Sequence, residues 1–465
     1  MKEVLDNQYV QLLLAIATLS SLVLIFYNIF VKLIKKEKTK RMKRRQVGFY
    51  RELDGEKFMK WRDLQLKKIY GDCHFTDIKG TLYPVFLMPF SEYFKYQDFK
   101  KKEVYSKDDV QNDGYSVCNG EVVFPPFYET SIMREGTKDE IRKKKKLIKQ
   151  YRRILTGSIK YPKLAGFSLD HYGFNDKGEV THIYPKLGTY EYNVFSSHIL
   201  EYELFTAYKK VKGKNVKLEE LWPLLPFRHY IHYGTGDVDK TNDALYSGAR
   251  RYSLFSVQCI VVFKDHNHKE YMTLLMKRST DPEKVAAKLG YYQFLPAGGF
   301  ELYEKEQIHS VEMIKENYSL RKAIFREYLE EVFDEKEFKT VIDSTNSETT
   351  DKIINHPKVA QVVSMIEDGR ATLNLLGIAV DLVSLRHEIS FVLKIEDEAY
   401  SREGFCPNDE FTRANSVASK VRISLKRVEE LLDGSQYQKK EAPKFNQASA
   451  LLYKMFKESP FYPEK

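Results

Sequence analysis

Apolar runs in the C-terminal half of the chain predict a series of strands and helices. Tyr252–Val262 and Tyr271–Arg278 are rich in β-branched and aromatic residues, and the polar segment between them predicts a turn. Gly377–Leu385 and Glu388–Ile395 predict two further strands, and Ala448–Lys457 predicts a late helix. Strands that mix with helices in this way indicate an α/β protein.

A short acidic stretch, Arg326–Glu331, is expected to lie on a helix between these strands. Glu327 lies three residues before Glu330 and four before Glu331, so a helix places the three carboxylates on one face. The apolar residues that fall on the opposite face are Phe325, Leu329 and Val332. Carboxylates that share a face repel one another, and a hard divalent cation such as Mg²⁺ is their usual partner. The alternative is a solvated helix face with salt bridges.

A glycine turn precedes the acidic stretch. Phe294–Glu301 (FLPAGGFE) has the pattern of a strand that runs into this turn. Together with Arg326–Glu331 it resembles the box of the Nudix hydrolase family, which runs glycine, five residues, glutamate, seven residues, and then Arg-Glu-apolar-x-Glu-Glu-x-Gly-apolar. Gly299 matches the opening glycine, and the acidic stretch matches the helical half of the box.

The sequence departs from the family's pattern between these two halves. The pattern places the arginine fourteen residues after the glycine, whereas Arg326 follows Gly299 by 27, so about thirteen residues are inserted. The family's first glutamate falls at Tyr318 when counted back from the arginine and at Lys305 when counted on from the glycine, and neither is acidic. Phe333 replaces the glycine that follows the acidic pair. The metal-binding half of the box is therefore intact, and the half that braces the arginine is altered.

The resemblance implies a fold, a reaction and a set of site residues. The fold is a Nudix-like α/β/α sandwich with a mixed sheet, and the reaction cleaves a phosphoanhydride bond in a nucleoside diphosphate linked to another group. Glu327, Glu330 and Glu331 would hold Mg²⁺ or Mn²⁺, which activates water. The other implied residues are Gly298 and Gly299 for close approach to phosphate and Arg326 for orienting the glutamates. The base is either one of the three carboxylates or a later acid, for which Glu388 is the candidate.

The N-terminal segment predicts a membrane anchor. Tyr9–Val31 contains no charged residue over 23 positions, which at about 1.5 Å per residue spans the roughly 30 Å hydrocarbon core. A cleaved signal peptide is the alternative, but the apolar run is long and no small-residue cleavage site is evident. Lys32–Arg45 carries nine Lys or Arg and one Glu, which places the N-terminus outside and the following domains in the cytoplasm. This basic cluster also suits contact with anionic lipid.

Composition sets bounds on the rest of the chain. Its 465 residues allow two or three domains, and an aromatic content of 14% excludes a disordered protein. The basic cluster supplies most of the net charge of +10, so the whole-chain charge is a weak argument for nucleic-acid binding. The four cysteines are far apart and have neither disulfide-framework nor zinc-ligand spacing.

The predicted organisation has four parts, which are a transmembrane helix at 9–31, a basic juxtamembrane linker at 32–60, an α+β domain of unknown type at 61–240 and a Nudix-like domain at 246–465. Asp139–Leu155 predicts a basic helix that is either a solvated face or a surface for phospholipid or nucleic acid. Gly166–Tyr184 predicts a hairpin that either binds a ligand or supports the C-terminal domain.

Two classes of function follow from these features. The first is a membrane-anchored Nudix-type hydrolase that acts on a cytoplasmic nucleotide, and the intact acidic triad favours it. The second is a catalytically weak Nudix-fold sensor or scaffold at the membrane, and the altered loop, Phe333 and the anchor favour it. A membrane-anchored nucleic-acid binder is a third and less favoured hypothesis. The implied partners are a nucleotide-type small molecule and membrane lipid. The sequence leaves open whether the chain forms a homodimer.

Overall fold

The structure is a computed structural model of the chain. It describes residues 27, 29–34, 36–37, 40–41, 44–91, 115–118, 121–155, 165–234, 243–266, 270–279, 288, 290–300, 310–311, 315, 317–335, 353–402, 405, 422–433 and 443–463. The chain divides into two compact units, Met1–Glu52 and Leu53–Lys465. In the first unit, the described residues from Tyr27 to Glu52 are helical.

Most of the predicted membrane helix falls outside this description. Residues 9–26 and 28 lie outside the described residues, as does Lys305, one of the two positions for the first glutamate of the box. Among the helices that the structure does describe, none combines the length and the apolar character that crossing a membrane requires.

Eight of the described strands form one mixed sheet in the second unit. The strands in order across it are β10 (Tyr292–Phe294), β9 (Tyr271–Lys277), β8 (Ser256–Lys264), β13 (His387–Ile395), β12 (Ala371–Asp381) and β3 (Val85–Pro89). Two short strands lie off this path, β11 (Ala297–Gly299) beside β8 and β14 (Arg422–Ser424) beside β9. β8 and β13 run parallel, and the other pairs are antiparallel. The predicted α/β class with a mixed sheet is confirmed.

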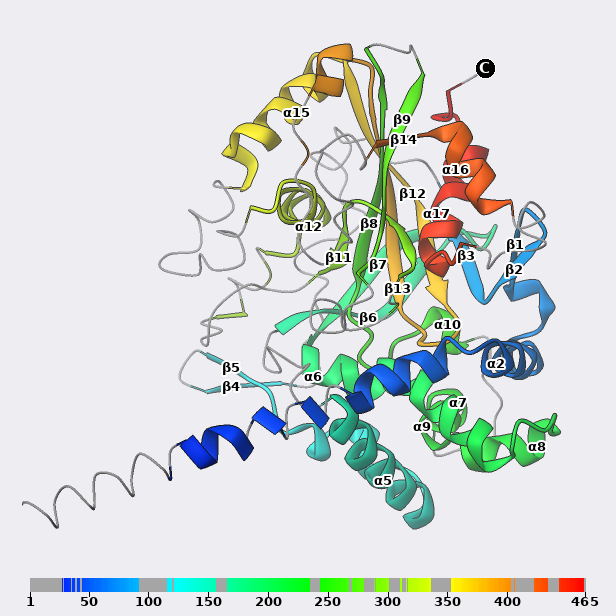
Figure 1. Cartoon of the computed structure of the whole chain (residues 1–465). Helices are drawn as coiled ribbons and strands as arrows, with labels where there is room; N and C mark the ends of the chain where they lie inside the picture. The colour runs from blue at the N-terminus through cyan, green and yellow to red at the C-terminus, as the bar shows by residue number, and fades with distance from the viewer. Residues whose placement is uncertain are drawn as a thin grey trace, which may run out of the picture. The chain divides into compact units, whose positions relative to one another are not determined.

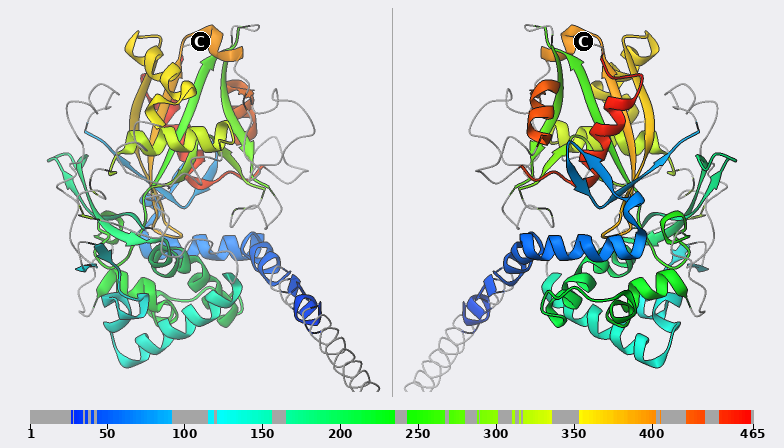
Figure 2. Two further views of the ribbon diagram at one scale, coloured as in Figure 1. Left: turned by 90° about the vertical axis from the view of Figure 1, so that its left-hand side faces the viewer. Right: turned by 90° about the vertical axis from the view of Figure 1, so that its right-hand side faces the viewer.

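Helices cover both faces of this sheet. Figure 1 shows α12 (Leu320–Glu327) and α15 (Pro357–Glu367) on one face and α16 (Leu425–Leu432) and α17 (Gln447–Glu458) on the other. The two side views in Figure 2 agree, because each brings one of these helix pairs in front of the strands. The sheet is therefore the middle of three layers, and each of its faces is buried.

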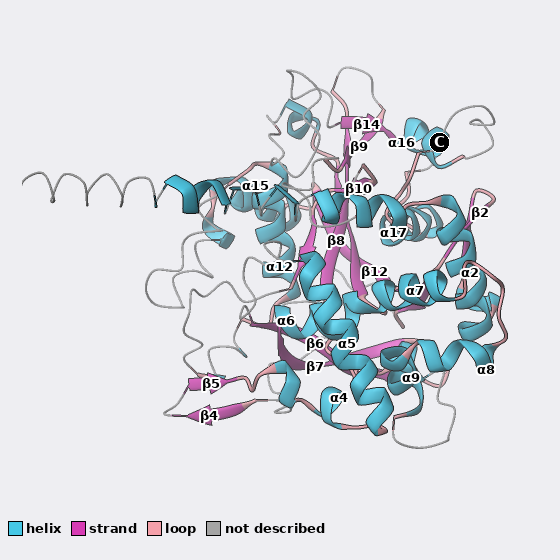
Figure 3. Cartoon of the chain, turned by 60° about the horizontal axis from the view of Figure 1, so that its bottom comes forward, coloured by secondary structure: helices cyan, strands magenta, loops and turns pink. Residues whose placement is uncertain are grey.

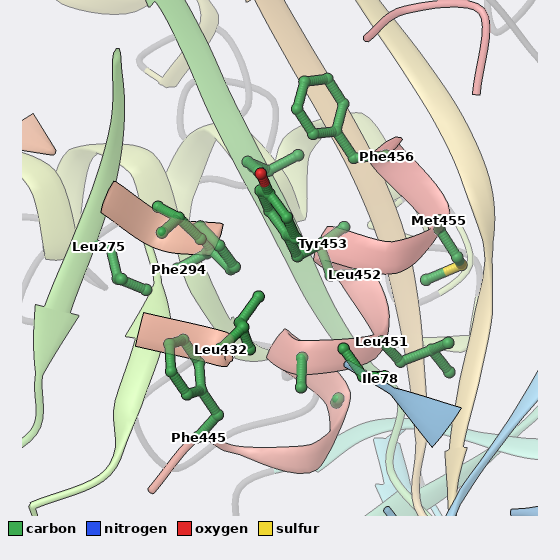
Figure 4. Close-up of a cluster of buried hydrophobic side chains, with 14 of the residues drawn as sticks. Ile78, Leu275, Phe294, Leu432, Phe445, Leu451, Leu452, Tyr453, Met455 and Phe456 are labelled. Carbon is green, nitrogen blue, oxygen red and sulfur yellow. The ribbon is translucent and has the colours of Figure 1, made fainter. Parts of the chain in front are cut away.

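The α17 side holds a large apolar core. Leu451, Leu452 and Phe456 of α17 are fully buried against side chains of the strands, including Phe294 of β10 (Figure 4). The rings of Phe294 and Tyr453 stack with their centroids 6.0 Å apart. Aromatic and aliphatic burial on this scale is the main force that holds a helix against a sheet.

Segments from the first half of the chain complete this unit. β3 pairs with β12 from Pro89 opposite Gly377 to Val85 opposite Asp381, so it forms one edge of the sheet. The predicted hairpin forms as β6 (Ala165–Phe174) and β7 (Val180–Thr189). Its Phe167 accepts a hydrogen bond from the amide of Phe255 and donates one to the carbonyl of Phe300, at 2.9 and 3.2 Å. These contacts are those of a hairpin that supports the C-terminal sheet.

A helical layer lies beside the hairpin. Figure 3 shows α5, α7 and α9 packed together, and their residues are in contact. The helices of this part are α2 (Glu56–Tyr70), α4 (Ser131–Arg134), α5 (Lys138–Leu155), α6 (Tyr190–Asn193), α7 (Ile199–Lys210), α8 (Leu218–Leu221), α9 (Pro226–Tyr233) and α10 (Asp243–Tyr246). Two further small hairpins are β1 (Thr76–Ile78) with β2 (Thr81–Tyr83), and β4 (Ser116–Cys118) with β5 (Glu121–Val123).

A buried carboxylate joins two helices of this layer. Glu203 of α7 accepts hydrogen bonds from the amides of Phe227 and Arg228, at 2.6 and 3.2 Å, and so satisfies donors at the start of α9. Burial of this side chain raises the pKa of Glu203 to about 7, although the Arg228 guanidinium opposes the shift. Ionisation of Glu203 therefore costs free energy in the folded state.

This carboxylate should make stability depend on pH. The folded pKa lies above the unfolded value of 4.5, so its stabilising contribution is complete below pH 4.5 and is lost as the pH rises through 7. Relative to that of Glu203→Gln, the free energy of unfolding of the wild type should fall by on the order of 3 kcal/mol between pH 4.5 and 8. Urea denaturation of both proteins across this range measures the difference. Exposed Glu219→Gln is the control, and a wild-type-to-Glu203→Gln difference that stays constant with pH would contradict the assignment.

Candidate functional site

The acidic stretch forms a helix with an irregular end. α12 runs from Leu320 to Glu327, and Ser319 caps its N-terminus because its side chain accepts a hydrogen bond from the amide of Lys322. The chain then continues as one π-helical turn, Tyr328–Val332, where the sequence predicts an ordinary helix. The predicted apolar face is confirmed, since Phe325, Leu329 and Val332 are all fully buried. Single π-helical turns inside helices occur often at functional sites.

All three carboxylates of this helix are buried. The exposed fractions of Glu327, Glu330 and Glu331 are 5%, 4% and 5%, and that of Arg326 is 7%. They do not form the solvated face that the sequence left as an alternative. Burying several carboxylates beside one cation costs free energy. Packing of the helix against the sheet does not by itself require buried carboxylates.

Arg326 connects the acidic helix to the glycine strand. Its Nη2 donates to the carbonyl oxygen of Gly299 at 2.6 Å and to Oε1 of Glu327 at 2.7 Å. Its Nε lies 3.8 Å from Oε1 of Glu330. One side chain therefore fixes the positions of β11, Glu327 and Glu330 relative to one another.

The glycine strand β11 lies directly against the carboxylates. Glu331 Oε2 accepts a hydrogen bond from the amide of Ala297 at 2.6 Å. A Cβ atom added to Gly298 would lie 2.0 Å from Cδ of Glu327, so that carboxylate occupies the place of a side chain. The sequence predicts that the glycines admit phosphate, whereas the group that lies closest to Gly298 in the structure is the carboxylate of Glu327.

Gly298→Ala should therefore disturb the site. The new methyl group would force the Glu327 carboxylate away from Arg326, and such overpacking lowers the free energy of unfolding by about 1–3 kcal/mol. Chemical denaturation measures this loss. Gly48→Ala is the control, because a Cβ there meets nothing within 4 Å, and it should not lower the free energy of unfolding. Equal stability of both variants would show that Glu327 moves without cost.

Glu388 lies on the other face of the sheet. It is in register with Ser256 of β8, which is itself opposite Gly299. Gly298 faces α12, and side chains alternate along a strand, so Glu388 points toward the α17 side. Desolvation raises the pKa of Glu388, and the nearby charge of Arg386 opposes this shift. The structure thus brings together the arginine, the three glutamates and the two glycines, but not Glu388.

Two departures from the family's box have visible roles. Tyr318 is buried, stacks on Phe300 with the ring centroids 5.3 Å apart, and lies tilted against Phe167 at 4.7 Å, so it packs the hairpin against the end of the glycine strand. Phe333 has φ −119°, which any residue adopts, and Asp334 takes the left-handed conformation with φ +55°. A glycine is therefore not required at position 333.

Sequence reasoning missed residues that fix the site from a distance. The aromatic group of Phe167, Phe300 and Tyr318 comes from three separate segments. The hydroxyls of Tyr328 and Tyr400 lie 2.6 Å apart and join the π-helical turn to the segment after β13. No local pattern marks these residues, because each depends on a partner far along the chain.

The donor set suits a hard divalent cation, although its present arrangement does not enclose one. Within the part of the chain that the structure describes, no group of three or more His, Cys, Asp or Glu side chains is arranged to hold a metal ion. Glu327 is turned to Arg326, and Glu331 is turned to the amide of Ala297. Three carboxylates within five positions supply the oxygen ligands that Mg²⁺ and Mn²⁺ prefer, and rotation of these long side chains would let them converge.

Comparison with known proteins adds nothing to this geometry. The chain matches no family model, and it matches no curated protein.

Proposed function

We propose that the protein is a Nudix-type hydrolase that cleaves a phosphoanhydride bond in a nucleoside diphosphate derivative. The observation that carries the proposal is the buried acidic triad, Glu327, Glu330 and Glu331, held by Arg326 against a glycine strand. The order of elements supports it, because two strands, the glycine strand, the acidic helix, two strands and a late helix follow one another. The three layers correspond to an α/β/α sandwich, which is the fold we propose for this unit.

The chemistry would need a divalent cation. Glu327, Glu330 and Glu331 would hold Mg²⁺ or Mn²⁺, which when bound polarises a phosphate group and lowers the pKa of water. Arg326 keeps the helix and β11 in register, so that the carboxylates stay beside the backbone of Gly298 and Gly299. One of the three carboxylates takes the proton of the attacking water while the bond between phosphorus and the bridging oxygen breaks. Glu388 has no part in this scheme.

The second candidate is a nucleotide sensor or scaffold with weak catalysis. The contacts that favour it are the internal ones of the acidic triad, since Glu331 already binds the amide of Ala297 and Glu327 already pairs with Arg326. A site that is satisfied in this way binds a cation only after its side chains turn. Nucleotide binding without turnover is the result that would distinguish this candidate.

We also propose that the N-terminal segment anchors the protein in a membrane. The support is the uncharged run Tyr9–Val31 followed by the basic cluster Lys32–Arg45. The catalytic unit would then face the cytoplasm, and the basic cluster would contact anionic lipid headgroups. A nucleotide-type molecule is the partner that the acidic site implies.

The proposal is tested with the full-length protein and a panel of nucleotides. The panel contains nucleoside triphosphates, ADP-ribose, NAD, dinucleoside polyphosphates and CoA, each with Mg²⁺ or Mn²⁺. Release of phosphate-containing products identifies a hydrolase and its substrate class. Thermal stabilisation by a nucleotide without product supports the sensor. If no nucleotide of the panel is hydrolysed and none stabilises the protein with either metal, both candidates are overturned for this panel.

A further inference from the structure

Two arginine side chains are buried where the helical layer meets the sheet. Arg228 lies on α9 and Arg251 lies just before β8, and their exposed fractions are 0% and 1%. Around them are the hairpin β6–β7, the turn that joins β12 to β13, and α10 (Figure 1). A buried guanidinium needs hydrogen-bond acceptors and a compensating charge, so the partners of each arginine decide its role.

Arg228 has such partners within the chain. Its guanidinium donates to the hydroxyl of Tyr70 and to the carbonyl oxygens of Leu382 and Val383, the latter two at 3.1 and 2.6 Å. Glu203 lies close enough for its pKa to respond to the charge of Arg228. These contacts tie α9 to the turn after β12, and they account for Arg228 as a structural residue.

Arg251 is different, because one edge of its guanidinium has no partner. Its Nη1 donates to the carbonyl oxygen of Ser247 at 2.8 Å. Its Nε and Nη2 have no hydrogen-bond partner among the residues that the structure describes. These two nitrogens form the edge of an arginine that binds two oxygens of a carboxylate or phosphate at once. Among the described residues, Arg251 also makes no ion pair with a carboxylate.

Two more buried polar groups without partners lie close to Arg251. The hydroxyl of Tyr172 and Nδ1 of His387 have no hydrogen-bond partner among the described residues, and the two rings are 5.7 Å apart. Burial raises the pKa of Tyr172 and lowers that of His387, and the charge of Arg251 opposes the first shift and adds to the second. The three side chains come from β6, the segment before β8 and the start of β13, so they converge from separate elements.

The hydrogen-bonding character of these groups can be read from their other contacts. His387 Nε2 lies 3.1 Å from the carbonyl oxygen of Leu245, so Nε2 carries the proton and Nδ1 is an acceptor. The ring is neutral, because burial lowers the pKa of His387 to about 3. The group thus offers two N–H donors from Arg251, one O–H donor from Tyr172 and one acceptor. A small oxyanion that carries one hydroxyl, such as monohydrogen phosphate, complements this set.

We propose that Arg251, Tyr172 and His387 form a binding site for one small oxyanion of the size of inorganic phosphate. Their exposed fractions are 1%, 5% and 0%, so the site lies in the interior, away from bulk solvent. The anion neutralises Arg251 and joins the hairpin to the first residue of β13. The site shares no residue with the acidic helix, so it is a second function of the fold that stands whether or not the protein is a hydrolase.

The test measures anion content and anion-dependent stability of the full-length protein. Purified protein is exchanged into phosphate-free chloride buffer and denatured, and the released phosphate and sulfate are measured by ion chromatography. In parallel, Tm is recorded against inorganic phosphate and sulfate at constant ionic strength. We expect either about one anion per chain after exchange, or a rise in Tm of about 2–5 °C at saturating anion. Arg251→Met should abolish both responses.

Two further variants distinguish a loss of anion binding from a folding defect. Tyr172→Phe removes one donor and keeps the ring, so it should fold and weaken the anion response several-fold. Arg142→Met changes an exposed arginine of α5 and should keep the full response. A wild-type protein that releases no anion and shows no Tm shift overturns the proposal. A shift of equal size in Arg251→Met or in Tyr172→Phe also overturns it, because the anion then binds elsewhere.

Discussion

Replacing Glu330 and Glu331 together by glutamine is expected to lower nucleotide turnover by about a hundredfold to a thousandfold or more. Glutamine keeps the size and most of the contacts of glutamate but removes the charge that holds a cation and accepts a proton. The stability of the fold should not fall, because the change removes two buried like charges from one helix. Initial rates on the best substrate of the panel, together with Tm, measure both effects.

The matched control is Glu219→Gln with Glu220→Gln. These residues are also an adjacent glutamate pair on a helix, but both are exposed. The control should keep wild-type turnover. If the Glu330/Glu331 variant also kept it, the acidic helix would not be the catalytic site. A large drop in the Tm of the Glu330/Glu331 variant would instead mean that the carboxylates have a structural role.

Gly248→Ala is expected to destabilise the protein by about 3 kcal/mol or more, at the upper end of the cost of overpacking. A Cβ atom at Gly248 would lie 1.9 Å from the carbonyl oxygen of Leu169, and this oxygen belongs to the backbone of β6 and cannot rotate away. The amide of Gly248 also donates to the carbonyl of Asp170 at 2.7 Å, which fixes the close approach. Chemical denaturation measures the loss.

Gly173→Ala provides the comparison within the same hairpin. Its new Cβ would lie 3.3 Å from the Cβ of His182, a contact that a small shift relieves. We expect a loss of less than about 1.5 kcal/mol there. Similar losses for the two variants would mean that the segment around Gly248 moves freely away from β6.

The sequence located those elements whose pattern is local. β8, β9, β13, α5 and α17 lie within a few residues of their predicted bounds, because hydrophobic periodicity and turn residues determine them. β12 was placed too late in the chain. Leu382–Leu385 is as apolar as a strand, but Asp381 accepts hydrogen bonds from Val383 and Ser384 and turns the chain there.

The site was predictable only in part, because only some of its features depend on a local pattern in the sequence. The acidic triad and its apolar opposite face follow from helical spacing within one segment. The burial of the carboxylates depends on β11, which reaches them only because it pairs with β8. The face on which Glu388 lies depends on the register of β13 with β8, and a single strand read alone does not give that register.

The edge strand β3 has a consequence for how the protein is made. Its partner residues in β12 follow it by roughly 290 positions, a separation that places it among the slowest kinds of contact to form. On a ribosome, β3 leaves the exit tunnel long before β12 is translated, and during that interval its partner strand in the sheet is missing. Its short length of five residues limits the risk that it pairs with another chain. The sheet of this protein can therefore be completed only after β12 and β13 have been made.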